Sequence, residues 1–413
     1  MASTYHGTVG PVRLLAQSKI DFHAAHNAAN RKIAILIRLE AFSMRRDTSE
    51  FALGEQASGL GGNLEASNII REDMRNRMDP AWRVVAAVCL AASAAVCARA
   101  QVDAELTAKR RLFPEIGPGF KTIKRGVDGK IYVLASPSPG LVVFSGEGKR
   151  LLSMREAQGL SADAKKEAME SGEVLVGFGE DFDIDGSGNL YVADPANNVV
   201  QVFAGTGKHL LTIPVTEPVS VATLPEGEVA VSTLREPELV NVYDKNGREV
   251  RDFGDPDQLT DRADLNRFLN IGKLANDALG HLYYAFEYAP EPTVRQYDRF
   301  GYAGEDIVYQ ELDALGEARA VRREIARQEK KGDAPRFKRV LTAVGVERDT
   351  GEVWMAMGDT LLHFDKEGDR RATYLLYTPE GARLEAVSMV VEKDKLLIGG
   401  DPIGIYEFEL PQD

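Results

Sequence analysis

The sequence predicts an all-β protein, a six-bladed β-propeller, and three observations support this prediction. One unit recurs along the chain every 40 residues or so, roughly the period of propeller blades. It consists, in order, of a Gly turn, an aromatic strand, a polar loop, a second apolar strand, another Gly turn and a third strand. Each unit contains short segments of alternating apolar and polar residues, a pattern that indicates strands rather than helices. The chain has 413 residues and is 44% hydrophobic, so six such units can share one core. Three or four short strands per unit favour a propeller over a solenoid.

The best copy of the repeat starts at Asp183 and reads "DIDGSGNLYVADPANNVVQVFAGTGKHLLTI". Strands A to D of each blade are expected to run from the central channel outward. The turn before strand D ends in a Gly, as in "SGEGK" from Ser145 and "DKNGR" from Asp244, and this Gly supplies the positive φ of a tight hairpin. We expect blades near residues 120–154, 175–214, 215–254, 269–309, 338–377 and 385–410.

The sixth unit stops after its C strand, "GIYEFEL", and lacks a D strand. An open sheet edge would expose unpaired backbone groups. The segment "AELTAKRRLF", residues 104–113, precedes the first A strand and has no other partner. We therefore expect residues 104–113 to close the ring as the outer strand of the last blade.

The segment before the repeats has the form of a secretory signal peptide. Residues 78–100 read "MDPAWRVVAAVCLAASAAVCARA", in which Arg83 precedes an apolar run that is too short to span a bilayer, and Ala98 and Ala100 form an A-x-A cleavage site. We expect cleavage after Ala100 and a mature propeller of residues 101–413 in the periplasm or outside the cell. Translation from Met74 or Met78 would make residues 1–77 a start-site artefact or a disordered leader.

Charge and cysteine content exclude several classes of function. From Gln101 onward there are 38 Lys and Arg residues and 54 Asp and Glu residues, a net charge of −16 compared with −13 for the whole chain. Such an acidic surface repels nucleic acid and anionic membranes. Both cysteines, Cys89 and Cys97, lie in the expected signal peptide, so the mature protein would contain no disulfide. We expect no membrane span after cleavage, and a monomer.

Residues 185–194, "DGSGNLYVAD", followed by "NNVVQVF" from Asn197, resemble an NHL repeat, and the chain from about Gln101 resembles bacterial six-bladed NHL-type (TolB-like) propellers. This resemblance implies that the D-to-A and B-to-C connections share one face, generally the ligand face. Three inserts fall in D-to-A connections, starting at Glu156, Asp255 and Gln310, and the third has the apolar stripe of a short amphipathic helix. We call this side the insert-bearing face, and the side with the A-to-B and C-to-D hairpins the turn face.

We expect a protein, peptide or carbohydrate partner to bind the insert-bearing face. Tyr288 would supply apolar contact and Arg235 would pair with a carboxylate. The expected ligand-binding residues are Asp194, Asn197, Arg235, Tyr288 and Asp401. The alternative interpretation is that Tyr288 and its neighbours only pack between blades and that the inserts only cap the ring.

Metal and catalytic motifs are weak in this sequence. Asp183, Asp185, Ser187, Gly188, Asn189 and Asp194 match an EF-hand spacing, but the segment falls where every unit has its A-to-B hairpin. Three histidines after the signal, His209, His281 and His363, occupy different blade positions and are not expected to converge on zinc. The sequence contains no Gly-x-Ser-x-Gly elbow and no Gly-rich phosphate loop.

We therefore expect an exported binding module without catalytic residues, metal ligands or a cofactor. The alternative is a divalent-cation-dependent hydrolase, lactonase or lyase with its site at the channel mouth. Lactonase-like six-bladed propellers bind such a cation through Glu, Asn and Asp residues. The candidates in this sequence are Glu180, Asn270, Asn276 and Glu385.

Overall fold

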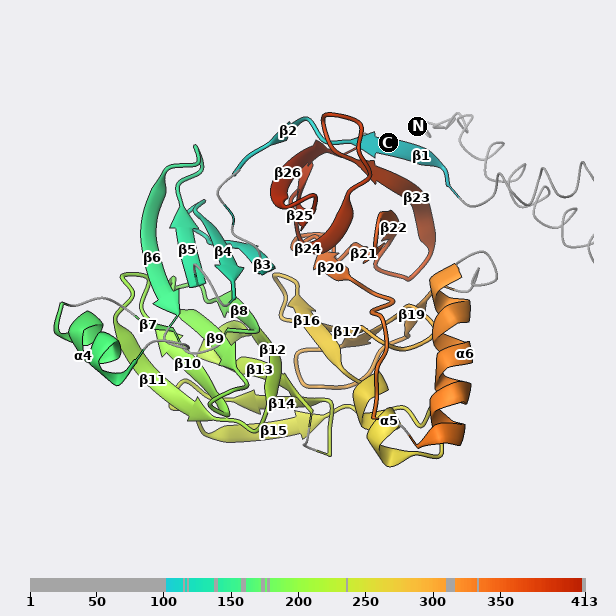
Figure 1. The fold of residues 1–413 in the computed structure, drawn as a ribbon, viewed down its shortest axis with the longest axis horizontal. Helices are drawn as coiled ribbons and strands as arrows, with labels where there is room; N and C mark the ends of the chain where they lie inside the picture. Colours follow the sequence, from blue (N-terminus) through green and yellow to red (C-terminus); the bar gives the residue numbers. More distant parts are fainter. Residues whose placement is uncertain are drawn as a thin grey trace, which may run out of the picture. The chain divides into compact units, whose positions relative to one another are not determined.

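Six β-sheets surround a central channel in the computed structural model (Figure 1). The structure describes residues 102–113, 116, 119–136, 140–156, 161–171, 175–176, 179–234, 237–309, 316–332 and 334–410. The expected leader and signal peptide, residues 1–100, lie outside these ranges. Within the described residues the chain is a six-bladed β-propeller, as the repeat predicted.

The first three blades follow one another in sequence. Blade 1 contains β3 (Phe120–Arg125), β4 (Ile131–Ala135), β5 (Gly140–Phe144), β6 (Arg150–Glu156) and β7 (Leu175–Val176). Blade 2 contains β8 (Asp181–Ile184), β9 (Leu190–Asp194), β10 (Val199–Phe203) and β11 (His209–Pro214). Blade 3 contains β12 (Pro218–Thr223), β13 (Val229–Thr233), β14 (Val240–Tyr243) and β15 (Glu249–Phe253), with the short 3-10 turn η1 (Pro225–Gly227) between its first two strands.

The other three blades complete the ring. Blade 4 contains β16 (Gly272–Asn276), β17 (Leu282–Phe286), β18 (Thr293–Tyr297) and β19 (Ile307–Val308). Blade 5 contains β20 (Ala343–Val346), β21 (Val353–Met357), β22 (Thr360–Phe364) and β23 (Arg370–Tyr377). Blade 6 contains β24 (Glu385–Val391), β25 (Lys395–Asp401) and β26 (Gly404–Glu409).

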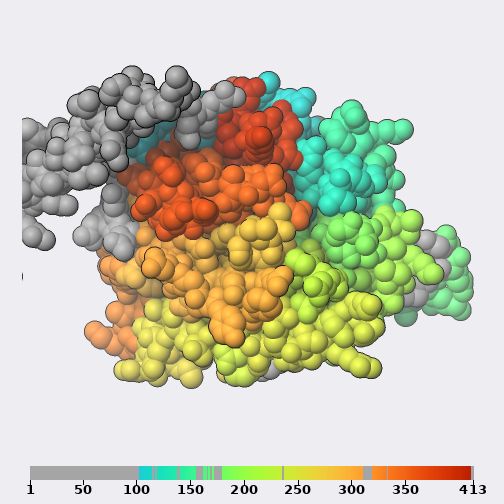
Figure 2. Space-filling view, turned by 180° about the vertical axis from the view of Figure 1, so that it is seen from behind, coloured from blue at the N-terminus to red at the C-terminus, as the bar shows by residue number. Residues whose placement is uncertain are grey.

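Residues 104–113 are divided between two blades. The segment β2 (Arg110–Arg111) pairs antiparallel with β26 and is the outermost strand of blade 6. The preceding segment β1 (Ala104–Thr107) instead pairs in parallel with β23, as a fifth strand of blade 5. In the space-filling view from behind, cyan atoms of the first described residues border the red atoms of the last blade (Figure 2). The N-terminal segment therefore joins two blades rather than one.

The irregular features of the blades, a register shift and a tight turn between strands C and D, also repeat from blade to blade. In blades 1, 2, 3 and 5, the register between strands C and D shifts at the last residue of strand C, next to the Gly turn. Each C-to-D turn in blades 3, 4 and 5 begins with an Asp whose Oδ1 accepts hydrogen bonds from the backbone N–H groups two and four residues later. The D-x-x-G-x motif thus supplies both the acceptor and the Gly that a tight turn requires.

The apolar core lies between blades rather than inside them. Six clusters of buried side chains occur among the described blades, and each contains residues of two neighbouring sheets. The cluster between blades 6 and 1, for example, joins Leu397 and Ile405 to Ile123, Val133 and Phe144. Strands that are buried on both faces account for the near-continuous apolar sequences of the B strands.

The three described helices all lie in D-to-A connections, where the inserts were located in the sequence. They are α4 (Ala162–Glu170), α5 (Ala263–Leu269) and α6 (Gly316–Lys331). Val321 and Ile325 of α6 pack with Leu269 of α5 and with Val340 in a small separate cluster. The expected stripe of α6 is therefore buried at these two positions, whereas Leu312 and Leu315 lie outside the described residues. No helix in the described part of the chain is long and apolar enough to cross a membrane.

Candidate functional site: a charged channel mouth on the insert-bearing face

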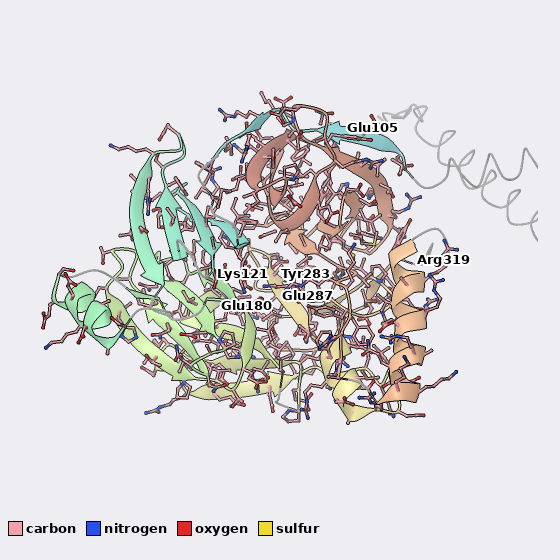
Figure 3. All side chains as sticks on the ribbon, in the orientation of Figure 1. Glu105, Lys121, Glu180, Tyr283, Glu287 and Arg319 are labelled. Atoms are coloured by element: carbon pink, nitrogen blue, oxygen red, sulfur yellow. The ribbon has the colours of Figure 1, made fainter. Side chains whose placement is uncertain are left out.

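Charged side chains from three blades meet where the A strands begin. Antiparallel pairing places the start of each A strand and the end of its B strand on the same face, which also receives the D-to-A connections. Lys121 lies in β3, Glu180 precedes β8, and Glu287 follows β17. Figure 3 shows these three residues together near the centre of the ring. They line the mouth of the channel on the insert-bearing face.

Arg339 connects the carboxylates of this mouth. Its guanidinium lies 3.8 Å from a carboxylate oxygen of Glu180 and 3.4 Å from Oε1 of Glu287, and its Nε donates a hydrogen bond of 3.3 Å to the hydroxyl of Tyr288. Glu180 is also paired with the Lys121 ammonium. Arg339 belongs to the connection between α6 and β20, so the third insert contributes directly to the mouth.

Glu287 is a buried carboxyl group with an unsatisfied oxygen. Glu287 is 2% exposed. Its Oε1 atom accepts no hydrogen bond within the described structure, although the Arg339 guanidinium lies nearby. Burial raises the pKa of Glu287, and the positive charges of Lys273 and Arg339 offset only part of this rise. Buried polar atoms are nearly always hydrogen-bonded, so this oxygen is a position where an additional donor would be stabilised.

A group of aromatic side chains adjoins Arg339. Phe268 of α5, Tyr288 of the B-to-C loop and Phe337 of the α6-to-β20 connection form a partly exposed row, which we call the aromatic row. The ring centroids of Phe268 lie 4.6 Å from those of Tyr288 and 5.6 Å from those of Phe337. The two D-to-A inserts and the B-to-C loop of blade 4 therefore build one surface of aromatic rings beside charged groups.

The sequence-predicted site residues do not form one cluster. Tyr288 lies in the aromatic row and contacts Arg339. Asp194 is fully buried, and its carboxylate accepts hydrogen bonds of 3.2 and 2.7 Å from the backbone N–H and Nδ2 of Asn197. This pair fixes the B-to-C turn of blade 2, and only Asn197 is exposed. Asp401 is exposed at the end of β25 in blade 6, and Arg235 lies outside the described residues.

The channel-mouth residues that the sequence analysis missed are Lys121, Lys273, Glu287, Arg339, Phe268 and Phe337. Lys121 and Lys273 are each the second residue of an A strand, but the other four lie in connections and at strand ends, so no single periodic pattern marks the group. The available signal was the third insert, whose C-terminal half, "PRFKR" from Pro335, places an aromatic and a basic residue just before an A strand. Glu287 was visible as a charged residue directly after an apolar B strand.

The residues proposed for a divalent cation are dispersed. Asn270 is buried at the end of α5, where its Nδ2 donates to the carbonyls of Asp257 and Asn266. Asn276 ends β16 at the opposite end of the channel, where it donates to the carbonyl of Thr223. Glu180 is paired with Lys121, and Glu385 is exposed. Among the described residues, no group of three or more His, Cys, Asp and Glu side chains is arranged to hold a metal.

The EF-hand-like segment is the A-to-B hairpin of blade 2. Oδ1 of Asp185 accepts hydrogen bonds of 2.8 Å from the backbone N–H groups of Ser187 and Asn189, and Gly188 has a φ of 81°. The carboxylate of Asp183 is directed to Thr223 of the next blade. Both carboxylates therefore stabilise the fold, as expected for a turn.

The three histidines lie in separate blades. His209 bonds to Thr212 at the outer edge of blade 2. His281 pairs with Asp277 in blade 4 at 2.7 Å. His363 stacks on Trp354 in blade 5 with a centroid distance of 3.9 Å. Each has its own local partner, and the three do not converge.

No family model and no curated protein matches the sequence. Among solved structures, a streptogramin B lyase has a TM-score of 0.44 and 11% identity, over 74% of this chain and 87% of its own. The virginiamycin B lyase of Staphylococcus aureus has a TM-score of 0.42 and 11% identity, over 73% and 88% of the two chains. A catalytically inactive variant of that lyase with quinupristin has a TM-score of 0.46 and 9% identity, over 72% and 97%. By the order of its own strands, this chain is a six-bladed β-propeller.

Proposed function

We propose that this chain is an exported binding propeller of the NHL type, without catalytic residues, and that its insert-bearing face binds a peptide, protein or carbohydrate. The observation that supports this proposal is the aromatic row next to Arg339. Aromatic and Arg side chains are the residues most enriched at binding hot spots. They lie on the face that carries all three described helical inserts. Short loops would be enough to connect the blades on that face, so blade closure does not account for the inserts.

The aromatic row and the charged mouth provide different kinds of contact. The half-buried rings of Phe268, Tyr288 and Phe337 offer flat apolar area for a sugar ring or an apolar side chain. Glu180 and Glu287 offer acceptors beside them, and Arg339 offers donors. A ligand with one apolar ring or side chain and neighbouring hydroxyl or amide groups uses both parts of this surface.

The test compares matched aromatic variants on the two faces. Glycan arrays and a peptide library are screened with the wild-type chain. The affinity of each hit for the wild type, for Tyr288→Ala and for Tyr302→Ala is then measured by calorimetry. Tyr302 is 75% exposed in a C-to-D hairpin on the turn face, so its removal is the control. Tyr288→Ala should weaken binding by at least about tenfold, the loss expected for a hot-spot ring. Equal affinity of Tyr288→Ala and wild type, or weakening by Tyr302→Ala or Lys245→Glu alone, would place the ligand elsewhere.

The second candidate is a hydrolase or lyase with its site at the same mouth. The specific observation in its favour is Glu287, because a buried carboxyl group with a raised pKa is a frequent general acid or base. Metal analysis after gentle purification distinguishes the two functions. Stoichiometric calcium or zinc, whose removal by a chelator lowers the melting temperature, would favour the enzyme.

A further inference from the structure

Cationic side chains outnumber acidic ones in the lining of the central channel. A cavity of about 120 Å³ lies between five of the six A strands. Its lining includes five cationic side chains and two carboxylates, although the whole chain has a net charge of −13. The cationic residues are Lys121, Lys124, Arg125, Lys273 and Arg348, and the acidic residues are Asp181 and Asp183. A cleft that reverses the sign of the surrounding surface concentrates ligands of the opposite charge.

Three of these cations lie at the turn-face end of the channel, where the A strands end. Arg125 ends β3 and is paired at 2.8 Å with Glu392. Lys124 lies 3.5 Å from Oδ1 of Asp183. Arg348 is exposed just after β20, and its guanidinium makes no hydrogen bond or ion pair with any described residue. Its backbone is held in place, because its carbonyl accepts a hydrogen bond of 2.9 Å from Ala278.

The carboxylate that pairs with Lys124 belongs to Asp183, and it also holds blades 2 and 3 together. Oδ2 of Asp183 accepts hydrogen bonds of 2.7 and 2.9 Å from the backbone N–H and the hydroxyl of Thr223. Lys124 has three N–H donors, and among the described residues Asp183 is the carboxylate that forms an ion pair with it. The Lys124 ammonium therefore keeps donors available for a ligand.

Lys124 is positively charged in this environment. Burial lowers its pKa and so does the positive charge of Arg348, but Asp183 and Asp181 raise it by more, and the pKa is raised overall. Lys124 and Arg348 line the same cavity, although they come from blades 1 and 5.

We propose that the turn-face end of the channel is a second binding site, which takes the carboxylate, phosphate or sulfate group of a small anion between Lys124 and Arg348. A guanidinium and an ammonium supply charge-assisted donors to such an oxyanion. The size of the cavity admits a compact anion and not a polymer. This site lies at the other end of the channel from the aromatic row, so either site can exist without the other.

The test uses inorganic phosphate as the probe, followed by sulfate and acetate, with ionic strength held constant by NaCl. Binding is measured by calorimetry and by 31P line broadening in the wild-type chain, in Arg348→Ala and in Arg248→Ala. Arg248 is an exposed arginine in the C-to-D hairpin of blade 3, on the same face but outside the channel, and serves as the matched control.

The wild-type chain should bind phosphate saturably, and Arg348→Ala should raise Kd by at least about tenfold, the effect of one lost charge-assisted hydrogen bond. Arg248→Ala should leave Kd unchanged. The relative affinities of phosphate, sulfate and acetate then identify the anionic group. The absence of saturable binding to all three probes, or equal Kd values for wild type and Arg348→Ala, would overturn the proposal. Because Arg348 is exposed and unpaired in the described structure, its removal should leave the fold intact, which an unchanged melting temperature verifies.

Discussion

The hydroxyl of Thr122 donates a hydrogen bond of 2.8 Å to Oδ1 of Asp181, across the boundary between blades 1 and 2. Oδ2 of the same carboxylate accepts a hydrogen bond from Ser220 of blade 3, so one buried side chain joins three blades at the channel wall. Ser220 in turn accepts a hydrogen bond of 3.0 Å from the backbone N–H of Leu274 in blade 4. Polar side chains of the A strands therefore continue the contact between blades where the apolar clusters end.

Asp181→Asn should destabilise the ring. An amide replaces one acceptor oxygen with a donor, so the O–H hydrogen of Thr122 or Ser220 loses its acceptor in a buried position. The expected loss is about 1–3 kcal/mol, the usual cost of a buried unsatisfied polar group, and it is measured as a lower melting temperature. The control is Asp252→Asn, which changes an exposed carboxylate on β15. A melting temperature of Asp181→Asn equal to that of the control would contradict the assigned role.

Removal of the N-terminal strands should weaken the ring at blades 5 and 6. A chain that begins at Pro114 lacks both β1 and β2, so the edges of β23 and β26 lose their partners. It also loses Phe113, which is buried and stacks on Phe144 with a centroid distance of 4.5 Å. We expect a loss of several kcal/mol relative to a chain that begins at Gln101, measured by thermal and urea unfolding. Unchanged unfolding would mean that the ring closes without these strands.

Glu287→Gln should stabilise the protein at neutral pH. Because burial raises the pKa of Glu287, the native state favours its protonated form, and the stability gained from that form is lost as the pH rises through the raised pKa. Glutamine keeps the shape and stays neutral. The variant should therefore be more stable than wild type by about 1–3 kcal/mol near pH 7.

This advantage should disappear below the ordinary glutamate pKa of 4.5, where the carboxyl group is protonated in both the folded and the unfolded states. Melting temperatures measured across this range test the sign. The control is Glu367→Gln, at an exposed position in the C-to-D turn of blade 5. A variant that is less stable than wild type at neutral pH would show that the pairing with Arg339 outweighs the cost of burial.

The proposed export predicts a defined N-terminus. The Arg-flanked apolar run and the A-x-A motif at Ala98 to Ala100 place cleavage before Gln101, so N-terminal sequencing of the exported protein should begin at Gln101, or be blocked by its cyclisation to pyroglutamate. Mass spectrometry of the native protein measures both forms. Detection of residues 1–77 in that protein would argue against this start site and this export route.

The strands and hairpins were predictable because their signals are local. Alternating apolar residues and the D-x-x-G-x turns act within about ten residues, and the structure has six sheets where the sequence has six units. The helical inserts were predictable for the same reason. The division of residues 104–113 between two blades was not, because β1 and β23 pair across more than 260 positions of sequence.

The charged mouth could not be predicted because its geometry depends on the closed ring. Lys121, Glu180 and Arg339 come from three different parts of the chain and meet only when blades 1, 2 and 5 surround the channel. The NHL-like segment did not indicate the role of Asp194, whose carboxylate accepts the hydrogen bonds that hold Asn197 in its own turn. The position of Tyr288 could be predicted from its B-to-C loop. The position of Phe268 and Phe337 beside it could not, because it depends on how two inserts pack together.

The pairing of β2 with β26 also sets an order of events during synthesis. Arg110 and Glu407, whose side chains are joined by a hydrogen bond, are separated by 297 residues. The ribosome produces β2 before any blade exists, and its partner β26 is made after the other five blades. Five blades can form while the nascent chain elongates, but the toroid remains an open arc until β26 has been made. Joining strands so distant in sequence is entropically costly and slow, so the newly made protein passes through a stage in which the two ends of this arc expose unpaired strand edges to the cellular folding machinery.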